Sequence, residues 1–386
     1  MSERAISLYV HIPFCAARCP YCDFATAPAR SPHRAPYLAT LAREIAARGA
    51  ELGRPSVDTL YLGGGTPSLL EPGEIAALAG AIDSAFELRP REATLEANPA
   101  TLDRDRLDAF RDGLGITRVS LGAQSLSTEG LRALARTHTV DDVRRSVELV
   151  RGAGADLNVD LIFGWPGEDR EAWRSDLRHA LGLAPDHVSC YPLTLVHEPE
   201  PAVANWPGAG WRALERWRAH AAAAQPDDDA MADMYVDAEE ILTGAGFVHY
   251  EIANWARPRH ESRHNLVYWR DGEWLGVGVG AHSHLDGRRF WNDGRLAVYL
   301  ERWSDGVPSS EGRPGDASET AMLALRLTRG LHFDDLARRY GAAASAVVRD
   351  RLAPLRGTGL LEWDDNTVAL TQRGRLLSNE VFVRLV

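Results

Sequence analysis

Three cysteines crowded near the N-terminus constrain this chain more than any other feature of its sequence. Cys15, Cys19 and Cys22 have the spacing C-x3-C-x2-C. Three thiolates so close together can chelate one metal centre, but a closed structural zinc site needs four ligands. A cubane iron–sulfur cluster held by three cysteines keeps one iron open to an outside ligand. We therefore predict a 4Fe-4S cluster. The alternatives are a zinc knuckle completed by His11 or Asp23, and three unrelated buried thiols.

Short apolar runs alternate with helical patterns through the first half of the chain. Strands are expected at residues 6–12, 57–62, 93–97, 116–122, 157–163 and 187–193. Helices are expected at residues 37–52, 74–86, 103–111, 141–152 and 171–183. Such a series of βα units predicts parallel strands with right-handed crossovers. The expected fold class is α/β, a partial (three-quarter) β/α barrel, with a doubly wound sheet as the alternative.

The second half of the chain differs in composition. Residues 205–245 predict two helices split by a turn at Pro226, and the polar, Pro/Gly-rich stretch 304–316 predicts a linker. The tail predicts helices and then a hairpin, typical of a winged-helix-like α+β module, at residues 318–327, 333–340, 344–355, 360–363 and 368–370. The expected domains are the barrel, an extension, and the linker with its C-terminal module, at residues 1–205, 206–303 and 304–386.

Unusual residues follow the predicted strands. In β/α barrels the chemistry lies in the loops after the strands. The cysteines follow the first strand, GGGTPS (63–68) the second, Glu96 and Gln124 end the third and fourth, and Asp160 lies within the fifth. We expect these groups to line one pocket, although a glycine-rich loop alone is usually a tight turn. Asp160 would be costly to bury without a partner, for which Arg136 or a ligand hydroxyl is the candidate.

Charge and cysteine usage exclude several classes of protein. A formal net charge of −11 argues against a nucleic-acid surface. Four cysteines, three of them clustered, do not form a disulfide framework and suit a reducing compartment. No signal segment precedes residues 6–12, and no apolar run reaches the roughly 18–20 residues of a membrane span. These features predict a cytoplasmic protein.

Six motifs occur in an order that resembles a known family. HIPFCAARCPYCDF, YLGGGTPS, LEANP, SLGAQS, RTHT and NVDLIFGWPGE resemble the oxygen-independent coproporphyrinogen III oxidase-like family of radical S-adenosylmethionine (SAM) proteins. The resemblance implies that Cys15, Cys19 and Cys22 hold the cluster and that its open iron takes SAM. The positions that match the family's SAM contacts are Tyr9, Tyr21, Gly64, Gly65, Thr66, Glu96, Gln124, Arg136 and Asp160.

Two features separate the branches of that family. The true oxidases place a further cysteine two residues after the triplet, where this chain has Phe24. The motif HNxxYW, formed by His264, Asn265, Tyr268 and Trp269, resembles the signature of the haem chaperone (HemW-like) branch. A neutral imidazole is a good axial ligand to haem iron, and aromatic rings offer flat apolar faces to a macrocycle.

The motif also has a purely structural interpretation. On a strand, His264, Leu266 and Tyr268 would share one face, where a histidine is often only hydrogen-bonded in place. His282 and His284 are then the reserve ligands.

The resemblance implies a haem chaperone that binds haem or porphyrin and passes haem to an acceptor protein of respiration. The alternatives are a coproporphyrinogen III oxidase, a radical SAM enzyme acting on RNA, and a zinc-binding structural protein. We expect neither a nucleic-acid partner nor an integral membrane segment. We do expect peripheral contact with membrane haem proteins.

Overall fold

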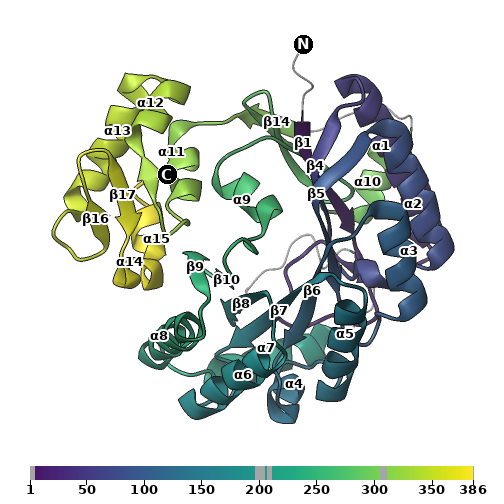
Figure 1. The fold of residues 1–386 in the computed structure, drawn as a ribbon, viewed down its shortest axis with the longest axis horizontal. Helices are drawn as coiled ribbons and strands as arrows, with labels where there is room; N and C mark the ends of the chain where they lie inside the picture. Colours follow the sequence, from purple (N-terminus) through teal and green to yellow (C-terminus); the bar gives the residue numbers. More distant parts are fainter. Residues whose placement is uncertain (1–4, 196–204, 207–210, 305–310, 386) are drawn as a thin grey trace.

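A curved, open sheet of parallel strands forms the centre of the molecule (Figure 1). The computed structural model describes residues 5–195, 205–206, 211–304 and 311–385. Neighbouring strands of the centre pair in parallel in the order β1 (Ala5–Ile12), β4 (Ser56–Gly64), β5 (Glu87–Ala97), β6 (Arg118–Gln124), β7 (Asp156–Phe163) and β8 (His187–Pro192). The sheet does not close, so the predicted partial barrel is confirmed.

Helices between these strands cover the outer side of the sheet (Figure 1). They are α1 (Arg34–Leu52), α2 (Pro72–Ala85), α3 (Arg104–Leu114), α5 (Val140–Gly152) and α6 (Arg170–Gly182), each close to its predicted position. Asp103 caps α3, since its carboxylate accepts from the amide of Arg106. The short α4 (Thr128–Ala133) was not predicted, because one and a half turns leave little periodicity.

Both edges of the sheet are extended by strands from later in the chain. Beyond β1 lie β11 (Trp274–Val277), β12 (His282–Leu285), β13 (Arg288–Trp291) and β14 (Glu311–Pro314); beyond β8 lie β10 (Asn254–Ala256) and β9 (Val248–Glu251). The linker prediction was therefore wrong for β14, which pairs with β13. A proline is tolerated there because β14 is an edge strand.

Two further helices pack beside the barrel. They are α7 (Trp211–Ala224) and α8 (Asp228–Gly244), and they are split after Pro226 as predicted. Asp237 on α8 is fully buried and forms ion pairs with Arg170 and Arg174 of α6. Among the described helices, none is both long enough and apolar enough to pass through a bilayer.

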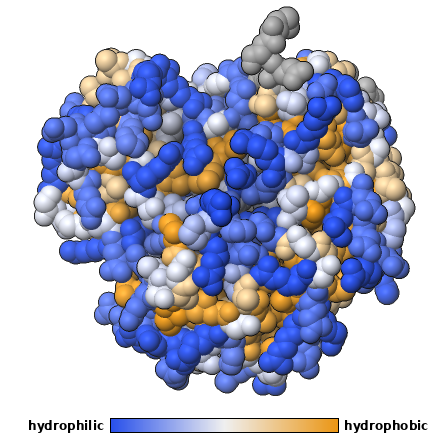
Figure 2. Space-filling view, viewed as in Figure 1, coloured by the Kyte–Doolittle hydropathy of each residue, from blue (hydrophilic) through white to orange (hydrophobic). Residues whose placement is uncertain are grey.

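The C-terminal module (residues 317–385) has its own hydrophobic core. Helices come first, then a hairpin, in agreement with the winged-helix-like prediction. Its elements are α11 (Ala317–Ala324), β15 (Leu331–His332), α12 (Phe333–Tyr340), α13 (Ala342–Leu352), β16 (Leu361–Trp363), β17 (Thr367–Leu370), α14 (Gln372–Leu376) and α15 (Ser378–Phe382). In the view of Figure 2, hydrophilic side chains cover most of the molecule, and hydrophobic side chains gather in the hollows of its surface.

The HNxxYW motif lies on a helix, α9 (Arg263–Trp269), so the strand considered for it was wrong. Ser262 caps the helix by accepting from the amide of Asn265, and Glu92 of β5 accepts from the amides of Arg263 and His264. These anchors are decisive because a seven-residue helix has little stability of its own. The His264 ring also contacts Thr59 of β4, which pairs with Glu92 and with Ser7 near the start of β1. Helix α9 therefore closes the end of the barrel opposite the cysteines.

The other side of α9 contacts the C-terminal module. The Arg326 guanidinium lies 4.4 Å from the centre of the Trp269 ring. Asp271, just after the helix, is buried and accepts from the Thr320 hydroxyl at 2.5 Å, while its carbonyl accepts from Arg339 at 2.6 Å. The helix is therefore a wall shared by the barrel and the module (Figure 1).

A buried carboxyl group fastens α1 to the extended edge of the sheet. Glu44 accepts from the Gly278 amide at 2.8 Å, the Tyr299 hydroxyl at 2.6 Å and the Asn292 side chain at 2.7 Å. Burial outweighs these hydrogen bonds and raises the pKa of Glu44 to about 7.

This pKa predicts a pH-dependent stability. Between the ordinary pKa of a glutamate and about 7, the native state holds a proton that the unfolded chain has lost, so stability falls as pH rises. We expect the free energy of unfolding of the parent protein to fall by about 3 kcal/mol relative to Glu44→Gln between pH 4.5 and pH 8. Denaturant unfolding of both proteins across this range measures the difference, and parallel pH profiles would contradict it.

Candidate functional site

One cavity of about 790 Å³ opens where the parallel strands end. It runs from the cysteines down to the N-terminal end of α9. Of the residues singled out in the sequence, its lining includes Cys15, Cys19, Tyr21, Cys22, Gly64, Gly65, Thr66, Glu96, Gln124, Arg136, Asp160 and Asn265. The structure thus brings together residues that lie up to 250 positions apart. Tyr9 is outside this lining, with its hydroxyl 3.0 Å from Nδ1 of His11.

The cysteine loop (residues 15–22) is held at its base by a short parallel pair, β2 (Phe14–Cys15) and β3 (Ala27–Pro28). The Thr66 hydroxyl lies 3.4 Å from the Cys15 sulfur. Burial raises the pKa of Cys15 to about 11 and that of Cys22 to about 12. Both are therefore neutral thiols until a cation takes the place of their protons, as metal binding requires.

Arg136 stands beside the cysteine loop instead of beside Asp160. Its Nη1 donates to the Cys19 sulfur at 2.8 Å. Asp160 accepts from the Ser120 hydroxyl and the Asn158 amide, each at 2.8 Å. Of the two partners considered for Asp160, Arg136 was wrong, because β6 and β7 already supply polar neighbours to this carboxyl group.

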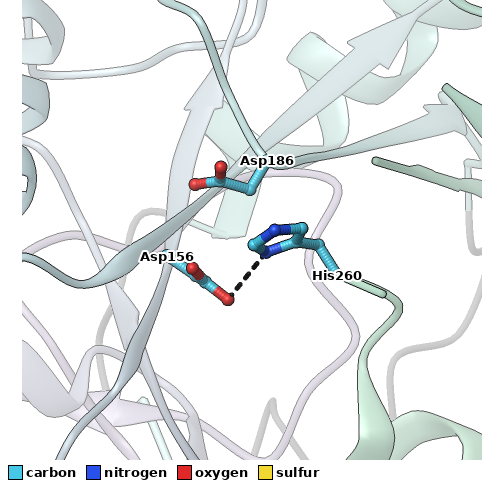
Figure 3. Close-up of side chains that lie close together, drawn as sticks. All are labelled: Asp156, Asp186 and His260. Atoms are coloured by element: carbon cyan, nitrogen blue, oxygen red, sulfur yellow. Dashed lines mark hydrogen bonds and ion pairs between the residues drawn. The ribbon is translucent and has the colours of Figure 1, made fainter. Parts of the chain in front are cut away.

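The arrangement of the three cysteines can be compared with the ligands around a single zinc ion. Among the described residues, the only group of three potential ligands within 4.8 Å of one another is Asp156, Asp186 and His260 (Figure 3). The three cysteine sulfurs are spread more widely than around zinc, where they lie about 4 Å apart. His11, a candidate fourth zinc ligand, has its ring nitrogens engaged by the Tyr9 hydroxyl and the Ala25 carbonyl. The thiols therefore fit a multi-iron cluster better than one zinc ion.

The glycine loop (residues 63–66) packs directly against the base of the cysteine loop. The amide of Gly65 donates to the Ile12 carbonyl, and that of Thr66 donates to the Phe14 carbonyl. A Cβ on Gly64 would lie 2.3 Å from the His11 ring, and one on Gly65 would lie 2.5 Å from the Pro13 carbonyl oxygen. Only glycine allows this approach, so the loop presents backbone groups to the cavity.

Two polar side chains lie beyond the glycine loop along the rim. Glu96 accepts from the Tyr61 hydroxyl and the Gly64 amide, both at 2.8 Å. Burial raises the pKa of Glu96 to about 7. Gln124 has a φ of +67°, a strained conformation for a residue with a side chain. The rim thus offers acceptors and donors suited to an ammonium group and ribose hydroxyls.

His264 is placed differently from the cavity residues. It is fully buried, with Nδ1 2.8 Å from the Thr59 hydroxyl and Nε2 2.7 Å from the Tyr268 hydroxyl. Burial lowers its pKa to about 3, so the imidazole is neutral. Of the four motif residues, only Asn265 lines the cavity. Neither ring nitrogen of His264 is free in this arrangement.

The reserve histidines are only partly engaged, since Nε2 of His284 has no hydrogen-bond partner. His284 is buried, with Nδ1 2.9 Å from the Gly272 carbonyl and 3.1 Å from Asp271. His282 is exposed and stacks on Trp291 with 5.7 Å between ring centres. Cys190, the remaining cysteine, is buried in β8.

Several cavity residues were missed in the sequence. They are polar residues at alternating positions of β6, β7 and β8, a period of two that points side chains into a barrel. The pattern was visible in RVSLGAQ, NVDLI and HVSCY. The residues are Arg118, Ser120, Asn158, His187, Ser189 and Tyr191.

Comparisons with known proteins agree with this geometry. Residues 9–180 match the model of the radical SAM superfamily, and residues 315–377 match that of the HemN C-terminal domain. The chain is 36% identical to the haem chaperone HemW of Mycobacterium tuberculosis, over 99% of this chain and 95% of that protein. It is 32% identical to HemW of Bacillus subtilis, over 97% and 98%.

A solved structure is also similar. Coproporphyrinogen III oxidase (HemN) from Escherichia coli, a radical SAM enzyme, superposes with a TM-score of 0.82 and 25% identity, covering 99% of this chain and 90% of that one. The architecture is thus shared with an oxidase, while the sequence is similar to chaperones along its whole length. The chain belongs to the HemW family of haem chaperones and carries a radical SAM domain.

Proposed function

We propose that this protein is a haem chaperone that binds haem and passes it to an acceptor protein of respiration. The observation that carries the proposal is similarity to HemW proteins over 99% of the chain, together with the HNxxYW motif on α9. The exposed Phe24, where the oxidases have a cysteine, favours the chaperone over the oxidase. We place the protein in the cytoplasm, because its four cysteines are unpaired. Contact with membrane haem proteins would then be peripheral.

Cys15, Cys19 and Cys22 would hold the 4Fe-4S cluster. When bound, the cluster supplies an electron and an open coordination position for SAM. The remaining SAM contacts would be the predicted residues that line the cavity, namely Tyr21, Gly64, Gly65, Thr66, Glu96, Gln124, Arg136 and Asp160. The glycine loop would offer its carbonyl groups to the SAM ammonium, since the amides of Gly64, Gly65 and Thr66 already donate within the protein. Arg136 would hold the Cys19 sulfur in place through its hydrogen bond. Tyr9 would support this set through His11, since it lies outside the cavity.

Haem would be bound at α9, with His264 as the axial ligand. The Nε2 atom must first leave the Tyr268 hydroxyl, so haem binding requires α9 to rearrange. Tyr268 and Trp269 would then offer their ring faces to the macrocycle. The three predicted domains would serve as a SAM domain (1–205), a haem-binding extension (206–303) and an acceptor-facing module (304–386).

The direct test is transfer of haem. Haem-loaded protein, reconstituted anaerobically with cluster and SAM, should give up haem to haem-free respiratory proteins, seen as the shift of the Soret band. Failure to bind haem, or turnover of coproporphyrinogen III by decarboxylation at enzyme-like rates, would refute the chaperone assignment.

The cluster assignment predicts the behaviour of two cysteine variants. Cys19→Ser should lose most of its iron and sulfide, about four of each per chain in the parent protein, and should no longer bind SAM. Cys190→Ser is the matched control, because this thiol is buried in β8 and outside the cavity. Iron and sulfide analysis after anaerobic reconstitution checks both. A full cluster in Cys19→Ser would contradict the assignment.

SAM binding should depend on the charge of Glu96. With a pKa of about 7, this carboxyl group is protonated below neutral pH and attracts the SAM ammonium only above it. We expect affinity for SAM to rise between pH 6 and 8 and Glu96→Gln to abolish most of that rise. Equilibrium dialysis with labelled SAM measures this, and an unchanged slope in the variant would exclude the contact.

Haem affinity should respond in opposite directions to two changes in α9. His264→Ala should weaken haem binding, because the ligand is lost. Tyr268→Phe should strengthen it about fivefold or more, because the closed state then leaves Nε2 without a partner. His179→Ala serves as the control, because this histidine is exposed on the outer helix α6. Haem titration by absorbance decides; equal affinities in all four proteins would remove His264 as the ligand.

A further inference from the structure

A buried cation without an ion-pair partner lies at the far end of the cavity. Arg118, the first residue of β6, is 3% exposed and lines the cavity. Its Nη1 donates to the His260 carbonyl at 2.9 Å, whereas Nη2 has no hydrogen-bond partner. Within the described residues, no carboxylate oxygen lies within 4.0 Å of this guanidinium. Such a charge is costly to bury unpaired, so the site is incomplete as it stands.

The surroundings of Arg118 also have an excess of donors. The Thr94 hydroxyl, 1% exposed, lines the cavity and has no hydrogen-bond partner. Ser262 and Asn265, at the start of α9, complete this end, and we call these four residues the barrel floor. They belong to three separate segments of the chain, so the floor is assembled only by the fold.

Nearby acidic groups are already engaged. Asp160 accepts from Ser120 and Asn158, and Arg118 acts on it only through space, without an ion pair. Glu92, beneath the floor, accepts from the amides of Arg263 and His264. Neither carboxylate neutralises Arg118 through an ion pair.

The cluster of side chains behind Arg118 positions it. His260, whose carbonyl accepts from Arg118, is held by Asp156 at 3.0 Å (Figure 3). Asp186, the third member of that cluster, accepts from Arg151 at 2.7 Å and from the Leu157 amide at 2.8 Å. These acids therefore fix the segment that leads into α9 and leave the free edge of the guanidinium facing the cavity.

The floor is distant from the cluster end of the cavity. Gln124 at the rim lies six positions after Arg118 along β6, a rise of about 20 Å. The carboxylate of a SAM molecule that binds the open iron cannot lie at both ends. The floor is therefore available to a second anionic group.

We propose that the barrel floor binds a carboxylate of the cargo, namely a haem propionate, with Arg118 as its ion-pair partner. A guanidinium matches a carboxylate through two parallel hydrogen bonds, and Thr94 adds a third donor. The inference rests on the proposed haem-chaperone function. It places this propionate on the cavity side of α9, next to Asn265.

The test compares haem with its dimethyl ester, which keeps the ring and the iron but lacks both charges. Binding is measured by absorbance titration with the full-length, anaerobically reconstituted protein. The parent should bind haem about tenfold or more tightly than the diester, because a hydrogen-bonded ion pair is lost. Arg118→Gln should bind the two ligands alike, and Arg118→Lys should keep part of the preference.

A matched control separates the charge from general effects on folding. Arg257 also donates to a carbonyl, that of Ala245 at 2.7 Å, but lies outside the cavity lining. Arg257→Gln should retain the full preference for haem. Added acetate tests for a free small carboxylate as the occupant: if it lowers haem affinity in the parent and Arg118→Gln alike, Arg118 is not the site of competition and the proposal fails.

The outcomes distinguish this inference from the function on which it rests. Parent protein that binds haem and its diester equally, or an Arg118→Gln variant that keeps the preference, would overturn the propionate site and leave the chaperone function standing. Parent protein that binds neither ligand would overturn both.

Discussion

The parallel register of the central strands determines where every functional group lies. Tyr9 of β1 pairs with Tyr61 of β4, which in turn pairs with Thr94 of β5. Because all six strands run in the same direction, the loops that follow them meet at one rim, and the residues that precede them meet at the other. The cysteine loop, the glycine loop, Glu96 and Gln124 therefore share the rim. The same register brings Arg118 to the opposite end.

Much of this arrangement could be predicted from the sequence. The apolar runs and the helices between them gave the order of elements to within a few residues, and position after a strand was sufficient to group the cysteines with Glu96. The pairing of Asp160 could not be predicted, because its partners Ser120 and Asn158 are ordinary polar residues that matter only through strand pairing. Arg118 escaped notice for the same reason.

The HNxxYW motif shows a different limit. Its residues fit the periodicity of a strand or of a short helix, and the choice depends on Glu92, more than 170 positions earlier, which caps the amides of Arg263 and His264. Local propensity cannot reveal such a distant anchor. The burial of His264 follows from that choice, because one helical turn places the Tyr268 hydroxyl against its Nε2. The motif therefore fixes a helix in addition to any ligand that it binds.

Helix α9 is a partition only one helix thick. One face borders the cavity through Asn265, and the other meets the C-terminal module through Trp269 and the adjoining Asp271. Thermodynamic linkage is reciprocal. If a ligand in the barrel loosens α9, the C-terminal module separates from the barrel more easily, and separation of the module favours binding of that ligand by the same free energy. Binding of a ligand in the barrel and binding of a partner to the module would then be coupled through one conformational equilibrium of α9.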